Sequence, residues 1–478
     1  MKKHLLVTLF ILGFFLPSIL FAQSIALGGR HSLAVCLDNT VDSWGYNGYG
    51  QLGNGNIMEQ NTPTTITGLS GVINIAGGLF HSLFLKSDGT VWSCGRNSPG
   101  NLGDGTNTDR YLPVQVLGLS NIVQVAGGGE HSLFVKSDGT VWACGLNSSR
   151  QLGDGTTISR TNVVQVIGLT EVIQAAAGAE FSLFLKNDGT VWACGHNGYG
   201  QYGNGTNITS TSPVQISGLT NVRQLSAGEW HSLFVKNDGT VWASGRNQYG
   251  QLGDGTIINK NAFFQINTLN GIMQADGGGI HSVFVKNDGT AWACGLNSSG
   301  FAGDNNGQLG DGTTVDKLTP VQVISNWGSE TIIHAEATRE HSLFLTANGS
   351  VWGCGRNNYG QLGNGVFAPI NSTSPVISNS STCTTPTNAI NKFDNDDLKV
   401  TIFPNPFSTQ TVLQTDNLLR NATLTVLNCF GQTLKQIKNI SGQTVVLSRD
   451  NLASGLFFIR LTENNRTLAV NKLVITDN

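Results

Sequence analysis

The chain has little charge and little proline. Only 12% of its 478 residues are Asp, Glu, Lys or Arg, about half the average usage, and the formal net charge is −3. Proteins that bind nucleic acid normally present a basic face, so this balance argues against nucleic acid as a partner. With only 11 Pro and no Gly-X-Y period, the 61 Gly exclude collagen and indicate many tight turns between short strands.

Long apolar runs are also scarce. The run at 5–16 follows Lys2 and Lys3 and precedes a small residue, Ala22. This pattern is typical of a secretory signal peptide, so we predict that residues 1–22 are cleaved; an uncleaved membrane anchor is the alternative. The run of 12 is shorter than the ~20 residues that span a bilayer, and we expect no transmembrane segment after cleavage.

The middle of the chain repeats. His-Ser-Leu or a near copy begins at seven positions, which are His31, His81, His131, Phe181, His231, His281 and His341. The interval is 50 residues five times and then 60, with most of the extra residues around 301–307. Each copy holds four short β-rich runs separated by Gly-rich turns, which predicts a seven-bladed β-propeller over residues 23–378. A solenoid is the alternative, but it would need polar caps at both ends.

The two ends of this array look complementary. The first copy begins with an inner-type strand at 24–27, and the last copy ends with an outer-type strand at 375–378. We therefore expect the two ends to complete one shared blade. Such closure removes the exposed sheet edges that favour aggregation.

Three motifs recur in series: Gly-Gly-x-x-His-Ser-Leu, Asp-Gly-Thr-Val-Trp and Gly-x-Asn-x-x-Gly-Gln-Leu-Gly. Together, over roughly residues 24–378, they resemble the regulator of chromosome condensation repeat family, and the resemblance implies a seven-bladed propeller. Members of that family usually carry Trp directly before the Gly that follows the third strand, whereas here only Trp44 does. Cysteine fills this column in five copies and Ser244 in one, and the Trp stands two places earlier. We interpret both columns as core packing.

The repeated polar residues are interpreted as structural. Packed sheets lie ~10 Å apart, so equivalent histidines on neighbouring blades are too distant to share a metal ion. We expect each histidine to pin its own loop through hydrogen bonds. The same spacing excludes disulfides within the cysteine column, so we expect buried free thiols at Cys94, Cys144, Cys194, Cys294 and Cys354. The remaining three, Cys36, Cys383 and Cys429, show no readable pairing.

Motifs for catalysis or cofactor binding are missing. The sequence contains no nucleophile elbow and no phosphate-binding Gly-Lys-Ser/Thr loop, so we predict no catalytic residues and no cofactor. We also predict no metal site. Calcium stays open as an alternative in the Asp-rich turns at 103–105 and in the insertion of copy six at 304–307.

Function is expected where the copies differ. In an up-and-down blade the first-to-second and third-to-fourth connections share one face, and these connections vary from copy to copy. They are rich in aromatic, Arg and Glu residues, as binding interfaces are. We predict partner binding through Arg30, Phe80, Glu130, Glu180, Trp230, Glu340, Arg96, Arg246, Arg356, Tyr199, Tyr249 and Tyr359. The alternative is that these are solvent loops that diverged after duplication.

The end of the chain has a different composition. Residues 379–397 are rich in Ser, Thr, Asn and Asp, as linkers are. Residues 398–478 hold about seven β-rich runs, which predicts a small immunoglobulin-like sandwich. These runs are 399–403, 411–414, 422–427, 433–437, 444–447, 455–461 and 468–475.

Four segments of this region occur in the order Ile402-Phe-Pro-Asn-Pro-Phe, Asn428-Cys-Phe-Gly-Gln, Leu452-Ala-Ser-Gly-Leu-Phe-Phe-Ile-Arg-Leu and Lys472-Leu-Val-Ile. They resemble the C-terminal sorting domain of type nine secretion substrates; a ligand-binding sandwich is the alternative. The resemblance implies contact with the type nine secretion machinery of a diderm bacterium. It also implies passage through the periplasm, followed by secretion or attachment to the outer cell surface, with cleavage of the domain left open.

These observations predict an exported, non-enzymatic propeller that binds a protein or glycan at the cell surface or outside the cell. The alternative from another class is a secreted hydrolase or lyase whose acids are Glu130, Glu180 and Glu340. The resemblance to the chromosome condensation family also implies guanine-nucleotide exchange on a small GTPase. The signal peptide and the lack of a basic face disfavour that third function.

Overall fold

The computed structural model describes residues 24–36, 38–298, 307–367, 371–378, 400–403, 405, 407–427, 433–450, 455–463 and 466–475. The chain divides into two compact units, one over Gln23–Thr384 and one over Thr385–Asn478. The described residues form strands and turns without a helix, which confirms the all-β class, and none of them forms a helix that could cross a membrane. The predicted signal peptide and linker lie outside the described residues.

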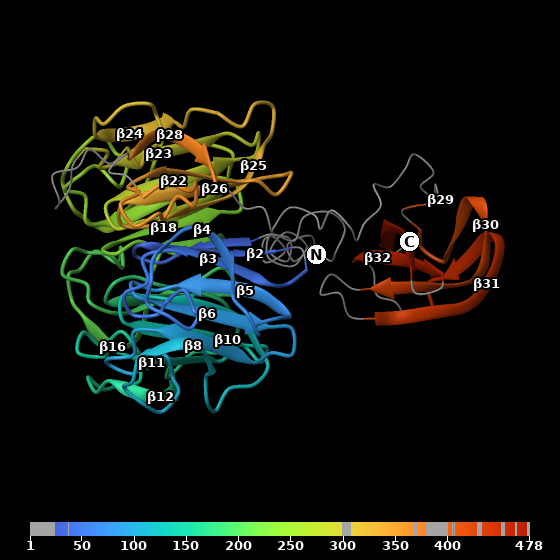
Figure 1. Ribbon diagram of the computed structural model, residues 1–478, viewed down its shortest axis with the longest axis horizontal. Coiled ribbons are helices and arrows are strands. Elements are labelled where there is room, and N and C mark those ends of the chain that lie inside the picture. Colours follow the sequence, from blue (N-terminus) through green and yellow to red (C-terminus); the bar gives the residue numbers. More distant parts are fainter. Residues whose placement is uncertain are drawn as a thin grey trace. The chain divides into compact units, whose positions relative to one another are not determined.

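The first unit consists of seven four-stranded antiparallel sheets in chain order, which confirms the seven-bladed propeller (Figure 1). Blade 1 is β1–β4 (Ser24–Leu27, His31–Val35, Val41–Gly45, Gln60–Thr65), blade 2 is β5–β8 (Val72–Gly77, His81–Lys86, Val91–Gly95, Arg110–Gln115) and blade 3 is β9–β12 (Ile122–Gly127, His131–Lys136, Val141–Gly145, Arg160–Gln165). Blade 4 is β13–β16 (Val172–Ala177, Phe181–Lys186, Val191–Gly195, Ser210–Gln215) and blade 5 is β17–β20 (Val222–Ala227, His231–Lys236, Val241–Gly245, Lys260–Gln265). Blade 6 is β21–β24 (Ile272–Gly277, His281–Lys286, Ala291–Gly295, Lys317–Gln322) and blade 7 is β25–β28 (Ile332–Ala337, His341–Thr346, Val351–Gly355, Ser372–Ile377).

The ring closes without a shared blade, so the prediction of a composite blade is wrong. Blade 1 already holds its own outer strand, β4, and blade 7 holds its own inner strand, β25. The two blades instead meet face to face, with β1 against β25 and β26. The Ser32 hydroxyl donates to the Gln361 carbonyl at 2.9 Å, and the amide nitrogen of Gly365 donates to the Asn61 carbonyl at 2.9 Å. Closure therefore uses the same kind of contact as every other pair of blades.

The hydrophobic core lies between the blades. Phe84 of β6 is fully buried and packs with Leu33 and Val41 of blade 1. The shifted tryptophans are only half-buried at the edge of these clusters, as Trp92 shows. The expectation of core packing therefore holds in full only for the other column, in which Trp44, the five cysteines and Ser244 are fully buried. A lysine covers the exposed side of the ring in several copies; the Nζ of Lys236 lies 4.5 Å from the Trp242 ring centroid.

The second unit is one five-stranded sheet, with β30 and β32 at its centre. Its strands are β29 (Val400–Phe403), β30 (Gln410–Leu427), β31 (Thr433–Ser448), β32 (Gly455–Glu463) and β33 (Arg466–Ile475). In the described residues the seven expected runs thus form five strands. The runs at 411–414 and 422–427 belong to one strand, and those at 433–437 and 444–447 to another, because β30 and β31 stay paired through register shifts near Leu419.

The two halves of β30 have different neighbours. Its first half pairs with β29 and its second half with β32, while β31 follows both halves. Leu413 of the first half and Leu424 of the second half belong to one buried cluster. The long hairpin is thus folded over a single core, as in a small sandwich.

Candidate functional site

A belt of hydrogen bonds joins the blades where their second strands begin. In six of the seven blades the Nε2 atom of the repeated histidine bonds to the serine hydroxyl of the next blade. The pairs are His31–Ser82 (2.9 Å), His81–Ser132 (2.9 Å), His131–Ser182 (3.0 Å), His231–Ser282 (2.8 Å), His281–Ser342 (2.7 Å) and His341–Ser32 (3.2 Å). The seventh pair is missing because Phe181 occupies the histidine position.

The serines of this belt determine the tautomer of the histidines, that is, which ring nitrogen carries the proton. The Ser82 hydroxyl donates its proton to the Gln51 carbonyl at 2.7 Å, so His31 must donate to it through Nε2–H. Burial, assisted by the charge of His81, lowers the pKa of His31 to about 3. The imidazole is therefore neutral near pH 7, and the belt is a structural device that holds one blade to the next.

The expectation that each histidine pins its own loop holds only for His341. Its Nδ1 accepts a hydrogen bond from the Thr338 hydroxyl at 2.9 Å. In all six blades that carry the histidine, its Nε2 bond crosses to the neighbouring blade, because blades in a ring converge toward the axis and come closer there than the ~10 Å of stacked sheets.

The cysteine column reaches the same main-chain carbonyls as the belt serines. The five column cysteines are buried free thiols, as predicted. Cys94 Sγ lies 3.4 Å from the Gln51 carbonyl oxygen, and in blade 1 the Trp44 indole donates to the Gln361 carbonyl at 2.9 Å. Burial raises the pKa of the Cys94 thiol, which makes it a poor nucleophile. Cys36, by contrast, is disulfide-bonded, and its partner lies outside the described residues.

The long third-to-fourth loops are held rigid from inside. In blade 2, Asn97 is fully buried; its Nδ2 donates to Asp104 Oδ1 at 2.9 Å, and its Oδ1 accepts from the Leu102 amide at 3.0 Å. The Arg110 guanidinium pairs with the other Asp104 oxygen at 2.7 Å. Burial opposes ionisation, but hydrogen bonds from Thr106 and Arg110 lower the pKa of Asp104. Both carboxylate oxygens of this turn, considered above as a calcium ligand, are thus used by the protein itself.

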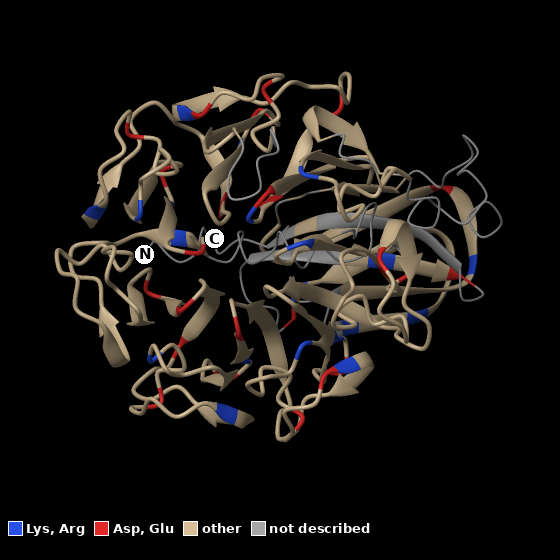
Figure 2. Ribbon diagram, turned by 60° about the vertical axis from the view of Figure 1, so that its left-hand side comes forward, with Lys and Arg blue, Asp and Glu red and all other residues tan. Residues whose placement is uncertain are grey.

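This loop clasp was missed from the sequence, although the repeats contain a signal for it. Four copies pair Asp with a cation at the start of the outer strand, and three copies have Asn with a neutral residue there. The charged pairs are Asp104–Arg110, Asp154–Arg160, Asp254–Lys260 and Asp311–Lys317; the neutral ones are Asn54 with Gln60, Asn204 with Ser210 and Asn364 with Ser372. Charged residues are accordingly scattered around the ring in Figure 2 rather than gathered on one face.

The predicted partner-binding residues lie together on one face of the propeller, called the loop face here. It is formed by the first-to-second and third-to-fourth connections of each blade, which touch: the Tyr46 amide donates to the Arg30 carbonyl at 2.9 Å. Most of the twelve are half-buried, whereas Glu340 and Arg356 are almost fully buried. Two further residues of the variable columns, Ile280 and Leu296, are buried at 3% exposure.

The first group of rings on the loop face is the blade-1 cluster, which consists of Tyr46, Tyr49, Phe80 and Tyr359. The Tyr46 ring centroid lies 5.0 Å from Tyr359 and 6.2 Å from Phe80, so three blades contribute to one ring cluster. Tyr49 lies 5.2 Å from Phe80. Tyr46 and Tyr49 stand in the variable columns of the repeat, and the structure shows that they join these rings.

Three arginines border the blade-1 cluster, and each has a carboxylate partner. Arg96 reaches Glu130 of the next blade at 2.5 Å. Glu340 pairs with Arg356 at 2.6 Å and with Arg30 at 3.9 Å. Three arginines thus share two glutamates, and each arginine forms an ion pair with one of them.

The second group is the blade-5 cluster, which consists of His196, Tyr199, Trp230, Tyr249 and Arg246. Trp230 packs edge-on against His196 and Tyr199, with ring centroids 5.2 and 5.6 Å away. The Arg246 guanidinium carbon lies 5.6 Å from the Tyr199 ring centroid and 5.5 Å from that of Tyr249. Burial lowers the pKa of His196 while the charge of Glu180 opposes that shift.

The three glutamates considered as hydrolase acids are separated and engaged. Glu130 is bonded to Arg96, and Glu340 is buried against Arg356. Glu180 accepts a hydrogen bond from the Ser149 hydroxyl at 2.7 Å. The hydrogen bonds and ion pairs of these carboxylates join each one to a cation or a hydroxyl rather than to a second acid. Their arrangement gives no support to a paired acid and base.

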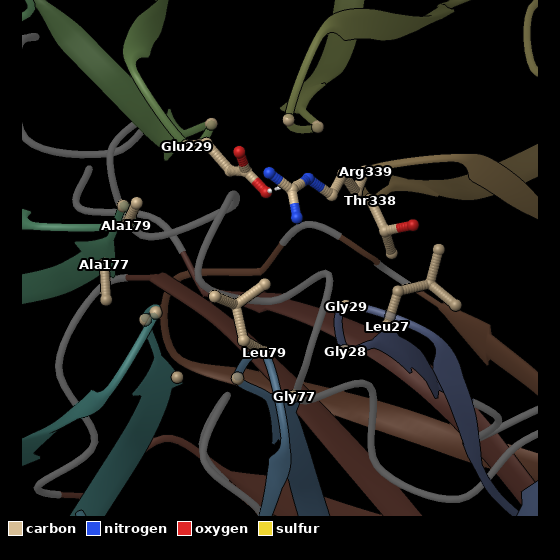
Figure 3. Close-up of a pocket in the computed structure, with 18 of the residues that line it drawn as sticks. Leu27, Gly28, Gly29, Gly77, Leu79, Ala177, Ala179, Glu229, Thr338 and Arg339 are labelled. Carbon is tan, nitrogen blue, oxygen red and sulfur yellow. Dashed lines mark ion pairs between the residues drawn. The ribbon is translucent and has the colours of Figure 1, made fainter. Parts of the chain in front are cut away.

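The inner strands surround a central channel, which is lined mostly by Gly and Ala at its loop-face end and holds a cavity of about 80 Å³. Figure 3 shows Glu229 and Arg339 pointing toward each other across it, and the Arg339 Nε lies 3.2 Å from Glu229 Oε1. Blade 6 lies between them and contributes Gly279, where a Cβ would come within 3.1 Å of Arg339. Burial raises the pKa of Glu229, and the charges of Arg339 and Arg246 oppose this rise.

A second polar group on the inner strands was missed from the sequence. Ser226, Asp276 and Glu336 occupy a column that is alanine in the other four blades, at Ala26, Ala76, Ala126 and Ala176. The Ser226 hydroxyl donates to Asp276 Oδ1 at 2.6 Å, and His334 Nε2 lies 2.7 Å from Glu336 Oε1. Burial raises the pKa of Glu336 to about 8, and burial and the charge of Glu336 raise that of Asp276 well above its usual range.

Family models agree with this architecture. The RCC1-like domain matches residues 107–403, and models of the regulator of chromosome condensation (RCC1) repeat match residues 38–85, 22–51 and 72–100. The secretion system C-terminal sorting domain matches residues 401–476. The two regions recognised from sequence motifs are thus found independently.

Individual relatives are similar over short stretches. Protein RCC2 homolog of Danio rerio is 41% identical over 75 residues, which are 16% of this chain and 14% of that protein. Alsin of Rattus norvegicus is 46% identical over 61 residues, 13% of this chain and 4% of that protein. The chain therefore spans only a small part of the length of these relatives.

Solved structures share the propeller. Human WBSCR16 superposes with a TM-score of 0.62 at 22% identity, covering 71% of this chain and 93% of that one. Prp20p of Saccharomyces cerevisiae superposes with a TM-score of 0.60 at 26% identity, covering 67% and 81%. The latter structure was described together with its binding to Gsp1p and histones.

Proposed function

Because this chain belongs to the RCC1-like domain family and ends in a secretion sorting domain, we propose that it is an exported, non-enzymatic propeller that binds a macromolecule through its loop face. The sorting domain implies export by type nine secretion to the cell surface or the extracellular space. The disulfide at Cys36 is consistent with that destination, since disulfides persist in oxidising compartments.

One observation carries the proposal. The positions that differ between copies gather into two clusters of aromatic and arginine side chains, on loops that are clasped from inside by buried asparagines such as Asn97. Residues of this kind on a rigid scaffold have the composition of interface hot spots. The Gsp1p and histone binding of Prp20p is not carried over, because this chain combines an export signal with low charge, and the charged residues of both signs in the described part are interspersed around the ring.

The proposal is tested by photo-crosslinking on living cells. A photoreactive amino acid at Phe80 or Trp230 should capture a partner, whereas the same amino acid at Asn187, an exposed turn residue of the opposite face, should not. Equal capture from all three positions, or capture from Asn187 alone, would show that the loop face is not the binding surface. Turnover of a polysaccharide or peptide that is lost in Glu180→Ala would favour the hydrolase instead.

A further inference from the structure

Arg246 differs from the other three arginines among the predicted partner-binding residues. Arg30, Arg96 and Arg356 each form an ion pair with a glutamate of the same face. The Nε and Nη2 atoms of Arg246 donate instead to the neutral Gln248 side chain, at 3.0 and 2.7 Å. Within the described part of the chain, no carboxylate forms an ion pair with Arg246.

The repeat explains why this arginine lacks an acid. Arg96 reaches Glu130, which directly precedes the belt histidine of the next blade. The equivalent residue for Arg246 is Ile280, which is buried at 3% exposure. The nearby Glu229 is engaged by Arg339 in the channel. Ile280 thus occupies, for Arg246, the position in which Glu130 supplies a carboxylate to Arg96.

Aromatic rings hold the Arg246 side chain in place. Its guanidinium lies over the rings of Tyr199 and Tyr249, 5.6 and 5.5 Å from their centroids, and Tyr199 is in turn packed against Trp230. Rings beside a guanidinium restrict its motion and shield it from water, which strengthens a charge-assisted hydrogen bond to an incoming anion. The planar fork of arginine matches a carboxylate with two parallel hydrogen bonds.

We propose that Arg246, Tyr199, Tyr249 and Trp230 form a receptor for a carboxylate side chain of a partner protein, an Asp or Glu beside an apolar residue that packs on the rings. The inference deepens the proposed function and rests on it. A protein source is favoured because Trp, Tyr and Arg together are the residues enriched at the energetic centres of protein interfaces. The arginines at the blade-1 cluster all form ion pairs with glutamates, so this cluster supplies contact area without an arginine that lacks an acid.

The test uses the mature full-length protein and short peptides. The probe is acetyl-Asp-Leu-amide, with acetyl-Asn-Leu-amide as its neutral match and glucuronate as a carbohydrate acid. Binding is followed by NMR of the Trp230 indole signal, assigned with Trp230→Phe. The acidic peptide should bind at least tenfold more tightly than the neutral one, and Arg246→Gln should abolish the difference. Lys236→Gln, which removes a cation stacked on a ring of the same blade but the opposite face, should leave it intact.

A variant that should gain a binding site distinguishes the proposal from loss of binding through misfolding. Glu130→Ile removes the carboxylate from Arg96, as Ile280 does for Arg246, and leaves Arg96 beside the rings of Tyr49 and Phe80. It should therefore create a second, weaker binding site for the acidic peptide and raise the stoichiometry from one to two. Equal binding of the acidic and neutral peptides, or acidic binding that survives Arg246→Gln, would overturn the proposal. Tighter binding of glucuronate than of the peptide would overturn the protein source. If crosslinking from Trp230 captures a partner while the peptide does not bind, this inference fails and the binding function stands.

Discussion

His81 and Phe80 are neighbours in the chain but belong to different parts of the molecule. The belt that contains His81 is built from the same residues in nearly every copy, and its bonds run from blade to blade. The loop face that contains Phe80 varies from copy to copy, and most of its rings and arginines are partly exposed. Repetition thus marks the residues that hold the ring together, and variation marks the residues that the ring presents.

The largest effect expected from this contrast is loss of the propeller in acid. Burial lowers the pKa of His31 to about 3 and that of His81 to about 4, against ~6.5 in an unfolded chain. Between these values the unfolded chain binds more protons, so the belt's contribution is complete above pH 6.5 and is lost as the pH falls toward 3. Thermal melts should show a melting temperature that falls steadily below pH 6.5. In a double variant, His131→Phe with His231→Phe, which places the blade-4 residue at both positions, the melting temperature should fall less steeply with pH. A melting temperature of the native protein that does not change below pH 6.5 would contradict a belt of neutral histidines.

The next effect contrasts two phenylalanines four residues apart. Phe84 is fully buried between blades, so Phe84→Ala should lower the free energy of unfolding by about 3–5 kcal/mol. Phe80 is half-buried on the loop face, and Phe80→Ala should change the free energy of unfolding by no more than about 1 kcal/mol. Denaturant unfolding of the two variants measures both. Similar losses would mean that the loop face is part of the structural core.

A smaller effect is expected at alkaline pH, from the polar column on the inner strands. The pKa of Glu336 is raised by burial to about 8, so the stability associated with its proton is complete below about pH 4.5 and is lost as the pH rises through 8. Glu336→Ala, the residue of four other blades, should reduce the difference in melting temperature between pH 6 and pH 9. Glu171→Ala, at an exposed acid of the opposite face, should leave that difference unchanged. An unchanged difference in Glu336→Ala would remove Glu336 as the cause.

The smallest effect concerns the gap in the belt. Phe181→His adds a hydrogen-bond partner for Ser232 but removes a fully buried apolar ring, so the change in the free energy of unfolding should stay within about 1 kcal/mol. The variant should also lose stability in acid more steeply than the native protein, because it adds a seventh buried imidazole to the belt. A stability loss of several kcal/mol would show that blade 4 is packed specifically around Phe181 and is not an interchangeable unit.

Much of the fold could be predicted from the sequence because a repeat multiplies each weak signal. Seven copies of one strand pattern indicate seven blades, and a column of cysteines at one position indicates free thiols. Repetition also misled: the first and last segments look complementary, yet every copy begins with an inner strand, so no blade is shared. In the sorting domain, the polar stretch at 415–417 indicates a break between strands, but β30 and β31 pair on both sides of it.

The candidate site was only partly predictable. The variable columns identify the loop face, because loop parity follows from four strands per blade. Which side chains meet depends on neighbouring blades: Arg96 finds Glu130 and Arg246 does not find an acid, although both arginines stand at the same position of the repeat. The sequence shows that Asp276 and Glu336 replace the alanine found in four other copies. That the two acids are buried close enough to raise the pKa of Asp276 is seen only in the structure.

The most direct measurement is the affinity of the loop face for the partner captured by crosslinking. Calorimetry should show that alanine at Phe80, Arg96, Trp230 and Arg246 together weakens binding at least a hundredfold, since interface anchors of these types each contribute about 2 kcal/mol or more. Alanine at four turn residues of the opposite face, Asp138, Asp188, Asp238 and Asp288, should leave the affinity unchanged. Undiminished binding by the loop-face variant, or loss of binding by the opposite-face variant alone, would contradict the account.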